Sequence, residues 1–482
     1  MFSIVEAIRE RAAPDAAALV QKDRTLSFTE LFAHCDAIAA AIRQTLLRDP
    51  ARVDRLRVGV YFPSCLEYVP FALATLAAGC CFVPIPDELA EEEKRELLHR
   101  TAVDAVIVAE SSAAWVPAEA QRVGSLEVGG QPIVILRLPV TQPAFPADAF
   151  EALNPAFIRF SSGTTGRSKG VLLSHESLLQ RITAANAGLQ IGAGDRVLWV
   201  LPMAHHFAVS IVLYLYHGAA TIIEEAHFGA DMLRAGAEQK ATVMYGSPVH
   251  YRQIVEAPPG AEWATLRLAV ATAAALDTAT TQKFHARFGR HLVQGLGIIE
   301  VGLPVLNLAG AKEAPEAIGL PLPAYECLLK TDDGSEPGEI YLRGPGMFDA
   351  YLDPWLPRAQ VVDAQGWFAT GDLGRRDAAG RIFICGRKKT LINMGGMKIF
   401  PEEVEAVLNA HPKVQLSLVE ARQHPLYGEV PVARYIPAPD TALTATELHH
   451  HCRTRLSGYK IPLIFTAVTE LPLTASGKLR RG

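Results

Sequence analysis

The segment from residue 157 to residue 173 constrains this chain most, and it reads Phe-Ile-Arg-Phe-Ser-Ser-Gly-Thr-Thr-Gly-Arg-Ser-Lys-Gly-Val-Leu-Leu. Its glycines let the backbone turn tightly and approach a ligand closely. Hydroxyl groups at those turns can donate to an anion, and Arg167 and Lys169 add positive charge. The segment predicts a loop that binds phosphate oxygens. The residues that we expect to form it are Ser161, Ser162, Gly163, Thr164, Thr165, Gly166 and Lys169.

Two simpler interpretations of this segment were weighed. A lone stretch rich in glycine and serine is usually a surface turn, but here distant motifs support the phosphate loop. A Walker loop is excluded, because Gly170 follows Lys169 where that motif has serine or threonine.

Strand and helix signals alternate along the first part of the chain. Ser27 and Glu30 form a capping box that opens a helix, and residues 57–62 and 81–85 read as strands on either side of a helix over 68–78. A strand, a helix and a strand in that order indicate layers of α/β structure with parallel strands. Further strands are expected at residues 197–201 and 242–245.

Composition excludes several classes of protein. The net charge of −5 without a basic arm argues against nucleic acid as a partner. The longest apolar run, residues 207–216, is well short of the ~20 residues that span a membrane. The N-terminus lacks the apolar core of a signal peptide, and the seven cysteines form no CxxC pair. We therefore expect a soluble cytoplasmic protein without a membrane anchor; the sequence does not indicate its oligomeric state.

The residues from Ser161 to Gly170 resemble the phosphate loop of the adenylate-forming superfamily, although Ser168 stands where that family usually has proline. The superfamily comprises acyl- and aryl-CoA synthetases, stand-alone carrier-protein ligases, nonribosomal adenylation domains and luciferases. The resemblance covers nearly the whole chain. It implies an α/β fold with a large N-terminal domain, residues 1–386, built of layered α/β subdomains plus a β-rich subdomain. A small mobile α+β C-terminal domain, residues 387–482, would follow.

Two further motifs carry the resemblance into the acid and nucleotide pockets. Pro202 to His206 resembles a turn whose histidine, here His205, closes the pocket around the substrate carboxylate. Residues 294–300, Gln-Gly-Leu-Gly-Ile-Ile-Glu, resemble the motif that lines adenine and holds magnesium. The resemblance places Gly295 and Leu296 at the nucleotide, Gly297 at the acid, and Glu300 with Thr164 at the metal.

This chain departs from the second motif at two positions. Leu296 replaces an aromatic residue whose stacking on a base is worth roughly 1–3 kcal/mol. Ile299 replaces a threonine whose hydrogen bond to a charged group is worth about 1.5–3 kcal/mol. We expect these changes to weaken ATP binding without removing the chemistry.

The last third of the chain supplies the remaining predicted residues. The resemblance places Asp372 and Arg387 on the ribose, and a carboxylate suits that task because it accepts two hydrogen bonds. It places the hinge at Lys389, which follows Arg387 by two residues, and the thiol tunnel at Gly395 and Gly396. Lys478, within Leu-Pro-Leu-Thr-Ala-Ser-Gly-Lys, matches the catalytic lysine that bridges the carboxylate and the α-phosphate.

The resemblance implies an AMP-forming acid–thiol ligase that uses ATP, Mg²⁺ and a small carboxylic acid. The thiol is expected to be coenzyme A, and the alternative is the phosphopantetheine of an acyl carrier protein. A hypothesis of another class is a non-catalytic nucleotide-binding remnant, against which the retained catalytic set argues: Thr164, Thr165, Lys169, Glu300, Asp372, Arg387 and Lys478.

Two positions suggest what kind of acid is activated. Ala208 stands where amino-acid-activating members place an aspartate, so we expect an acid without an α-amino group. Thr272 stands where relatives commonly have glycine. A β-branched residue is stiff and adds volume, so we expect the acid pocket, with His205, Thr272 and Gly297, to take a short or aromatic acid.

Overall fold

A computed structural model describes most of the chain. The residues outside the description are 48–54, 140, 142, 144, 161–168, 226–227, 259, 261, 273, 332–335, 395–396, 440, 474–478 and 482. The chain divides into two compact units, which are described separately. The first contains Met1–Ser161, Lys169–Glu326 and Arg343–Trp367, and the second contains Ser162–Ser168, Cys327–Leu342 and Phe368–Gly482.

One nine-stranded sheet of the first unit is mostly parallel. Its strands, in spatial order, are β16 (Leu320–Pro321), β15 (Gly302–Leu306), β14 (Leu292–Ile298), β13 (Leu268–Ala271), β12 (Val243–Gly246), β10 (Arg196–Trp199), β11 (Ala220–Ile223), β1 (Ala17–Gln21) and β2 (Arg24–Ser27). The central strands from β14 to β1 run parallel, so their carboxyl ends share one edge of the sheet.

The second nine-stranded sheet of this unit is mixed. Its strands are β20 (Trp355–Pro357), β19 (Ala350–Leu352), β9 (Gly170–Ser174), β8 (Pro155–Phe160), β4 (Cys81–Pro84), β3 (Arg57–Tyr61), β5 (Ala105–Ala109), β7 (Gln131–Arg137) and β6 (Gln121–Val128). Strands β5, β3, β4 and β8 are parallel, whereas β9 returns antiparallel to β8.

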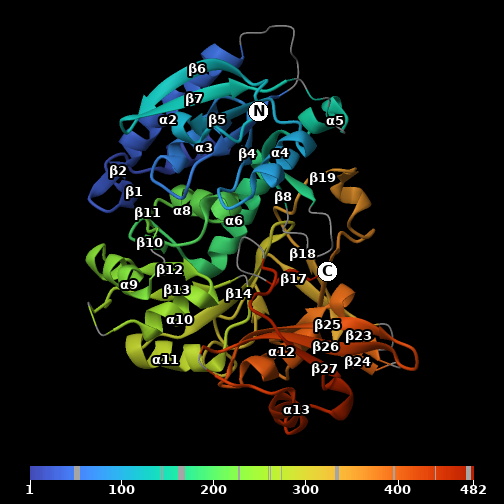
Figure 1. Cartoon of the computed structure of the whole chain (residues 1–482). Coiled ribbons are helices and arrows are strands. Elements are labelled where there is room, and N and C mark those ends of the chain that lie inside the picture. Colours follow the sequence, from blue (N-terminus) through green and yellow to red (C-terminus); the bar gives the residue numbers. More distant parts are fainter. Residues whose placement is uncertain are drawn as a thin grey trace. The chain divides into compact units, whose positions relative to one another are not determined.

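Helices cover both sheets and separate them. The longer helices of the first unit are α1 (Ile4–Arg11), α2 (Phe28–Leu46), α3 (Tyr68–Ala77), α4 (Glu91–Arg100), α6 (His175–Leu189), α9 (Gly229–Glu238), α10 (Pro248–Glu256) and α11 (Thr278–Phe288). Shorter ones are α5 (Ala147–Glu151), α7 (Met203–His206), the π-helical turn η2 (Phe207–Ile211) and α8 (Val212–Tyr216). Helices α9 to α11 pack on one face of the first sheet. Helices α6 and α8 lie between the two sheets, where α6 contacts β8, β9 and β15 (Figure 1).

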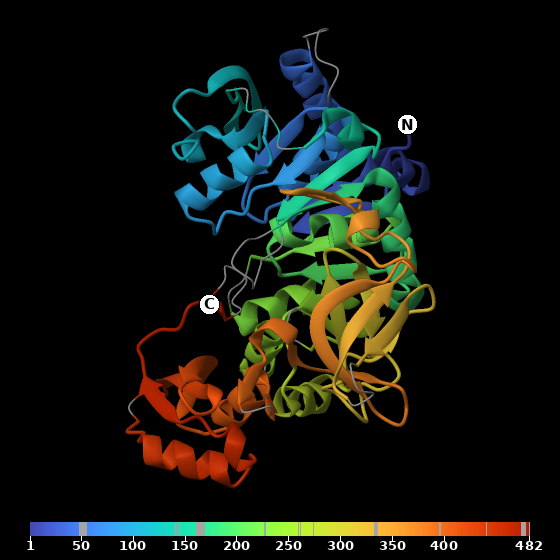
Figure 2. The ribbon, with the colours of Figure 1, turned by 90° about the vertical axis from the view of Figure 1, so that its right-hand side faces the viewer.

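The second unit is built on two smaller sheets. One contains β17 (Glu326–Lys330), β18 (Gly338–Arg343), β21 (Phe368–Arg376) and β22 (Ile382–Arg387). The other contains β24 (Met397–Ile399), β23 (Ile392–Met394), β26 (Gly428–Pro437), β25 (Val414–His424) and β27 (Ile464–Ala467). Helices α12 (Pro401–Asn409) and α13 (Ala445–Arg453) pack against the latter sheet around one buried core (Figure 2).

The structure confirms the predicted α/β fold class and the local signals that led to it. The capping box of Ser27 and Glu30 is formed and begins α2. The strand, helix and strand predicted between residues 57 and 85 are β3, α3 and β4, with the two strands parallel. Among the described residues, no helix combines the length and the apolar character that crossing a bilayer requires. The domain boundary at residues 386 and 387 and the hinge at Lys389 stay predictions.

Candidate functional site

Several predicted residues follow the carboxyl ends of parallel strands in the first unit. His205 lies in α7 beyond β10, Thr272 follows β13, and Glu300 follows β14. In the other sheet, β8 ends at Phe160, immediately before the predicted phosphate loop. Ligands of open α/β sheets bind at such edges, so the fold itself brings together residues that lie far apart in the sequence.

His205 forms a link between the two sheets. Its Nε2 contacts the Glu88 carboxylate, which lies beyond β4 of the other sheet. Burial acts to raise the pKa of Glu88, but the hydrogen bond and the charge of His205 outweigh it and lower that pKa to about 2. The carbonyl of His205 accepts a hydrogen bond from an Nη of Arg159 in β8. The turn that carries His205 is therefore fixed through both its ring and its backbone.

Glu300 belongs to a second cluster in the same unit. Its Oε1 accepts a hydrogen bond of 3.0 Å from the Tyr351 hydroxyl. Lys169 Nζ lies 4.4 Å from the centroid of the Tyr351 ring. Tyr351 thus connects the predicted metal ligand Glu300 to the one lysine predicted in the phosphate loop.

A buried arginine of α6 fixes the turn that presents Glu300. Arg181 donates to the carbonyl of Ile299 at 2.9 Å and, through Nε and Nη2, to the carbonyl of Gly346. Burial lowers the pKa of Arg181 to about 10, so the guanidinium is charged at neutral pH. The turn that presents Glu300 is therefore held by a buried side chain from another element.

The predicted acid-pocket residues Thr272 and Gly297 are neighbours. A Cβ added to Gly297 would lie 3.5 Å from the Thr272 hydroxyl oxygen, an ordinary contact. Thr272 is buried and hydrogen bonds to Tyr245, whose ring stacks on Trp199 with centroids 5.9 Å apart. Leu296, on the other side of β14, is buried, whereas Gly297 is exposed.

Glu300 fits a magnesium ion in chemical character. Magnesium takes oxygen ligands and is usually held by one or two carboxylates together with phosphate oxygens. Tyr351 is the hydrogen-bond partner that the structure gives the Glu300 carboxylate, so lone pairs are left for a cation. Within the described part of the chain, no group of three or more histidine, cysteine or acidic side chains is arranged to hold a metal. A magnesium site here would therefore depend on oxygens of the nucleotide.

In the second unit, the two predicted ribose residues face each other. Asp372 of β21 pairs directly with Arg387 of β22, and Arg387 Nε lies 2.8 Å from Asp372 Oδ1. Asp372 is buried, and the ion pair with Arg387 holds its carboxylate through Oδ1. Lys389 is exposed in the short 3₁₀ turn η4 (Lys388–Thr390).

Part of the predicted site lies outside the described residues. These residues are Ser161, Ser162, Gly163, Thr164, Thr165, Gly166, Gly395, Gly396 and Lys478. The backbone next to Lys478 is described: Leu473 pairs with Leu479, and the amide of Arg480 donates to the carbonyl of Pro472 at 2.8 Å. Arg481 then forms an ion pair of 2.6 Å with the buried Glu405 of α12. The roles of all these predicted residues stay predictions.

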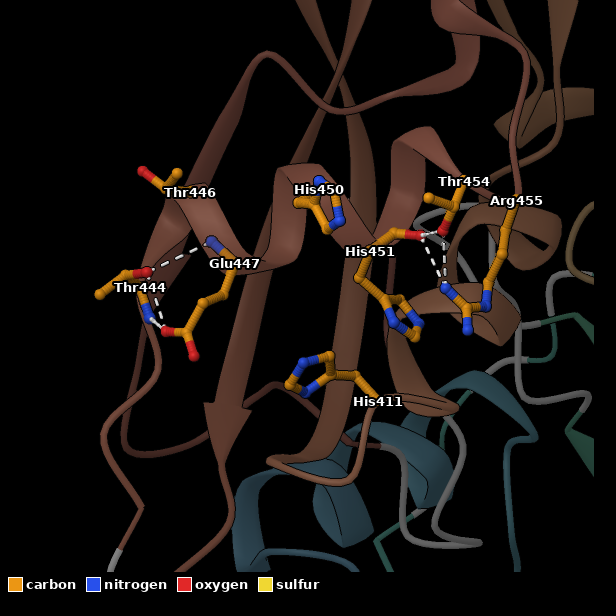
Figure 3. A pocket seen from close by; sticks show the side chains of 8 residues that line it. All are labelled: His411, Thr444, Thr446, Glu447, His450, His451, Thr454 and Arg455. Carbon is orange, nitrogen blue, oxygen red and sulfur yellow. Dashed lines mark hydrogen bonds between the residues drawn. The ribbon is translucent and has the colours of Figure 1, made fainter.

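A hollow of about 490 Å³ lies elsewhere in the second unit, beside α13 (Figure 3). Many of its polar groups are already bonded: Glu447 binds Thr444 and Lys413, and His451 Nε2 lies 2.9 Å from the Val407 carbonyl. None of the predicted site residues lines it. We assign no function to this hollow.

Four residues of the first unit that no motif indicated contact the predicted residues or, in the case of Arg181, the turn before Glu300. These are Glu88, Arg159, Arg181 and Tyr351. Arg159 carried a usable signal, because a charged residue interrupts the apolar strand that leads into the phosphate loop. Glu88 follows a fully buried strand at its carboxyl end, which is also a recognisable position.

Known proteins show the same organisation. The family model for AMP-binding enzymes matches residues 7–352, and the model for their C-terminal domain matches residues 403–478. A 3-[(3aS,4S,7aS)-7a-methyl-1,5-dioxo-octahydro-1H-inden-4-yl]propanoyl:CoA ligase of Mycobacterium tuberculosis is 30% identical, over 98% of this chain and 96% of the relative. A long-chain-fatty-acid–CoA ligase of Yersinia pestis is 32% identical, over 68% of this chain and 60% of the relative.

A solved structure supports the fold. The crystal structure of the anthranilate CoA ligase AuaEII in complex with anthranoyl-AMP has a TM-score of 0.81 at 22% identity, covering 99% of this chain and 96% of that one. The matches of both family models and the identity over nearly the full length of a curated relative decide the family. The chain belongs to the adenylate-forming superfamily of AMP-binding enzymes, as an AMP-forming acid–thiol ligase.

Proposed function

We propose that this enzyme activates a compact carboxylic acid with ATP and transfers the acyl group to coenzyme A. The observation that carries the proposal is that His205 contacts both Glu88 and Arg159, although the three residues come from two sheets. They lie near the carboxyl ends of strands, as do the phosphate loop after β8 and Glu300 after β14. Coenzyme A is preferred over a carrier protein because both curated relatives named above are CoA ligases.

In the first step, a carboxylate oxygen of the acid attacks the α-phosphorus of ATP, and pyrophosphate leaves. Such a step needs positioning and compensation of phosphoryl charge more than covalent help from the protein. His205, oriented by Glu88, would bind the acid carboxylate. Glu300 and the phosphate-loop residues would hold the triphosphate with magnesium, which neutralises charge on its oxygens. Asp372, oriented by Arg387, would accept the ribose hydroxyls.

In the second step, the coenzyme A thiol attacks the acyl carbonyl, and AMP leaves with the carboxylate oxygen. We assign Lys478 to the first step alone, because it would bring two anions together there. A rotation about Lys389 would then withdraw Lys478 and present Gly395 and Gly396 to the thiol. Rotations of this kind concentrate backbone changes at a few residues.

The restriction to a compact acid rests on the surroundings of Thr272. Thr272 and Tyr245 are hydrogen bonded across the ends of β12 and β13, and Tyr245 is held against Trp199. Behind Tyr245, toward α6 and α8, lies a cavity of about 10 Å³, room for about one water molecule. A long acyl chain would have to displace this packed set, so a short or aromatic acid fits better.

An ATP–pyrophosphate exchange screen over a panel of acids tests the proposal. We expect exchange that depends on added acid, with aromatic and short aliphatic acids preferred, and a CoA thioester when coenzyme A is added. Release of orthophosphate without any acid would indicate an ATPase, and nucleotide binding without exchange would indicate a non-catalytic remnant. Thioester formed only on a carrier protein would leave acid activation standing and refute coenzyme A.

A further inference from the structure

We propose that Arg159 is an additional substrate-binding residue, which holds the α-phosphoryl group of ATP and of the acyl-adenylate. This inference rests on the proposed function, because it assigns a ligand group to the same site. Arg159 is the penultimate residue of β8, so it lies two positions before the start of the predicted phosphate loop at Ser161.

The side chain of Arg159 points toward the turn that carries His205. Successive side chains of a strand alternate between its two faces, so Arg159 shares a face with Phe157. The Phe157 ring packs on Phe82, and Phe82 packs on Phe207, which follows His205 in the chain by two residues. Phe160 faces the other way, and the guanidinium carbon of Arg100 lies 4.8 Å from the centroid of its ring. Arg159 therefore lies on the His205 side of the strand, as its hydrogen bond to the His205 carbonyl also requires.

The guanidinium of Arg159 has donor capacity to spare. Its planar fork carries five N–H donors, and one nitrogen, Nη1, is used on the His205 carbonyl. Its Nε is buried and has no hydrogen-bond partner among the described residues. A buried donor without a partner is unfavourable, so the site would gain by binding an acceptor that a ligand supplies.

The charges around Arg159 indicate which ligand group that acceptor belongs to. Burial lowers the pKa of Arg159 to about 10, while the charges of Glu300 and Glu88 favour its charged form. Arg159 thus interacts electrostatically with Glu300, the carboxylate predicted to hold magnesium, and with Glu88, while its hydrogen bond joins it to His205, the residue predicted to bind the acid. In the proposed reaction, the α-phosphoryl group is the one that lies between these two sets of groups.

The segment before Glu300 offers no side-chain donor of its own. Residues 296–299 read Leu-Gly-Ile-Ile, so none of them has a side chain that can donate a hydrogen bond to a phosphoryl oxygen. Arginine suits the task, because its fork matches the geometry of phosphate oxygens and keeps its charge. Arg159 would offset the negative charge that grows on these oxygens while pyrophosphate leaves.

Binding of AMP and of adenosine to Arg159→Met tests the inference without relying on turnover. Adenosine lacks the phosphate and serves as the internal reference. We expect the variant to bind AMP about tenfold to a hundredfold more weakly, and to bind adenosine as the wild type does. Arg159→Lys, which keeps the charge and loses the fork, should lose less. Arg100→Met, which removes the guanidinium from the other face of the same strand, is the matched control and should bind AMP normally.

A double variant separates a ligand contact from a structural role. Ile299→Thr, added to Arg159→Met, supplies a hydroxyl near Glu300 and should recover part of the lost AMP affinity. Equal losses for AMP and adenosine, or unchanged affinity for both, would overturn the inference. So would a loss confined to the affinity for the acid, which would place Arg159 on the carboxylate. A wild type that binds no AMP and shows no acid-dependent exchange would refute the proposed function itself.

Discussion

At the scale of single residues, the most informative contact joins Glu88 to His205. A histidine at a strand end has two ring nitrogens, and the group bound to one of them decides what the other can do. Here Glu88 contacts Nε2. The Glu88 carboxylate therefore fixes the orientation of the ring that we expect to contact the acid substrate.

Glu88→Gln should lower stability in a manner that depends on pH. The folded-state pKa of Glu88 is depressed from 4.5 to about 2, so its ionised form stabilises the folded state above pH 4.5. This contribution, of at most about 3 kcal/mol, is lost as pH falls from 4.5 toward 2. Measuring the unfolding free energies of the wild type and of Glu88→Gln between pH 7 and pH 3 checks this prediction. The difference in unfolding free energy between the two proteins should narrow as pH falls. A constant difference, or an equal effect of Glu92→Gln at an exposed position of α4, would contradict the prediction.

The sequence indicated candidate functional residues but not all of their partners. His205 and Glu300 of the first unit, and Asp372 and Arg387 of the second, could be named because each belongs to a recognisable motif, and their roles stay predictions. Their partners Glu88, Tyr351 and Arg181 lie far away in the chain, and only the folded sheets bring them together. Contacts between distant segments leave no local periodicity in a sequence, so they could not be predicted from it.

At the scale of elements, α6 acts as a support for the Glu300 turn. Arg181 holds the carbonyls of Ile299 and Gly346, which belong to segments that share no strand pairing. Burying the charged guanidinium of Arg181 would be costly without these hydrogen-bond acceptors.

Arg181→Met should therefore be strongly destabilising, by about 2–4 kcal/mol, because it leaves two buried carbonyls without donors. Chemical denaturation measures the change. Arg181→Lys should recover a part of it, since one ammonium cannot reproduce the three hydrogen bonds. If Arg181→Met were as stable as the wild type, the turn would be held by other contacts.

Thr272, at the end of β13, tests the acid pocket. Thr272→Gly should raise the rate with longer acids relative to short ones by about one decade, because filling a packed site typically costs 1–3 kcal/mol. The ratio of kcat/KM across acids of increasing length measures it. Thr281→Gly, at a buried threonine of α11, is a control for general loosening. A wild type that already prefers long-chain acids would contradict the size argument.

Among elements, strand and helix types were easier to predict than sheet order. The capping box of α2 and the buried runs of β3 and β4 are local signals, and the structure confirms them. The order of strands from β16 to β2 depends on crossovers between distant segments. No local pattern specifies it, and the resemblance alone supplied the architecture.

At the scale of the whole molecule, the two chemical steps should depend on different residues of the C-terminal domain. Lys478→Ala should reduce adenylate formation by at least a hundredfold, while a supplied acyl-adenylate is still converted to thioester. Pyrophosphate exchange and single-turnover thioester formation measure the two steps independently. An equal loss in both steps, with the variant still folded, would show that Lys478 does not serve the first step alone.

Gly396→Trp should give the opposite pattern. A bulky side chain at the predicted thiol tunnel should leave pyrophosphate exchange largely intact and reduce thioester formation at least tenfold, since a slender thiol arm needs close approach to the backbone. The same two assays apply. A variant that forms thioester at the parent rate would show that the tunnel runs elsewhere.

The most direct test of the central claim follows the oxygen atoms of the acid. If the carboxylate attacks the α-phosphorus and the thiol then attacks the carbonyl, an acid labelled with ¹⁸O in its carboxylate must transfer one labelled oxygen to AMP. Mass spectrometry of the nucleotide measures this in a single reaction with ATP and coenzyme A. We predict AMP with one ¹⁸O atom and unlabelled pyrophosphate. Label in orthophosphate together with ADP, or unlabelled AMP alongside thioester, would contradict an acyl-adenylate.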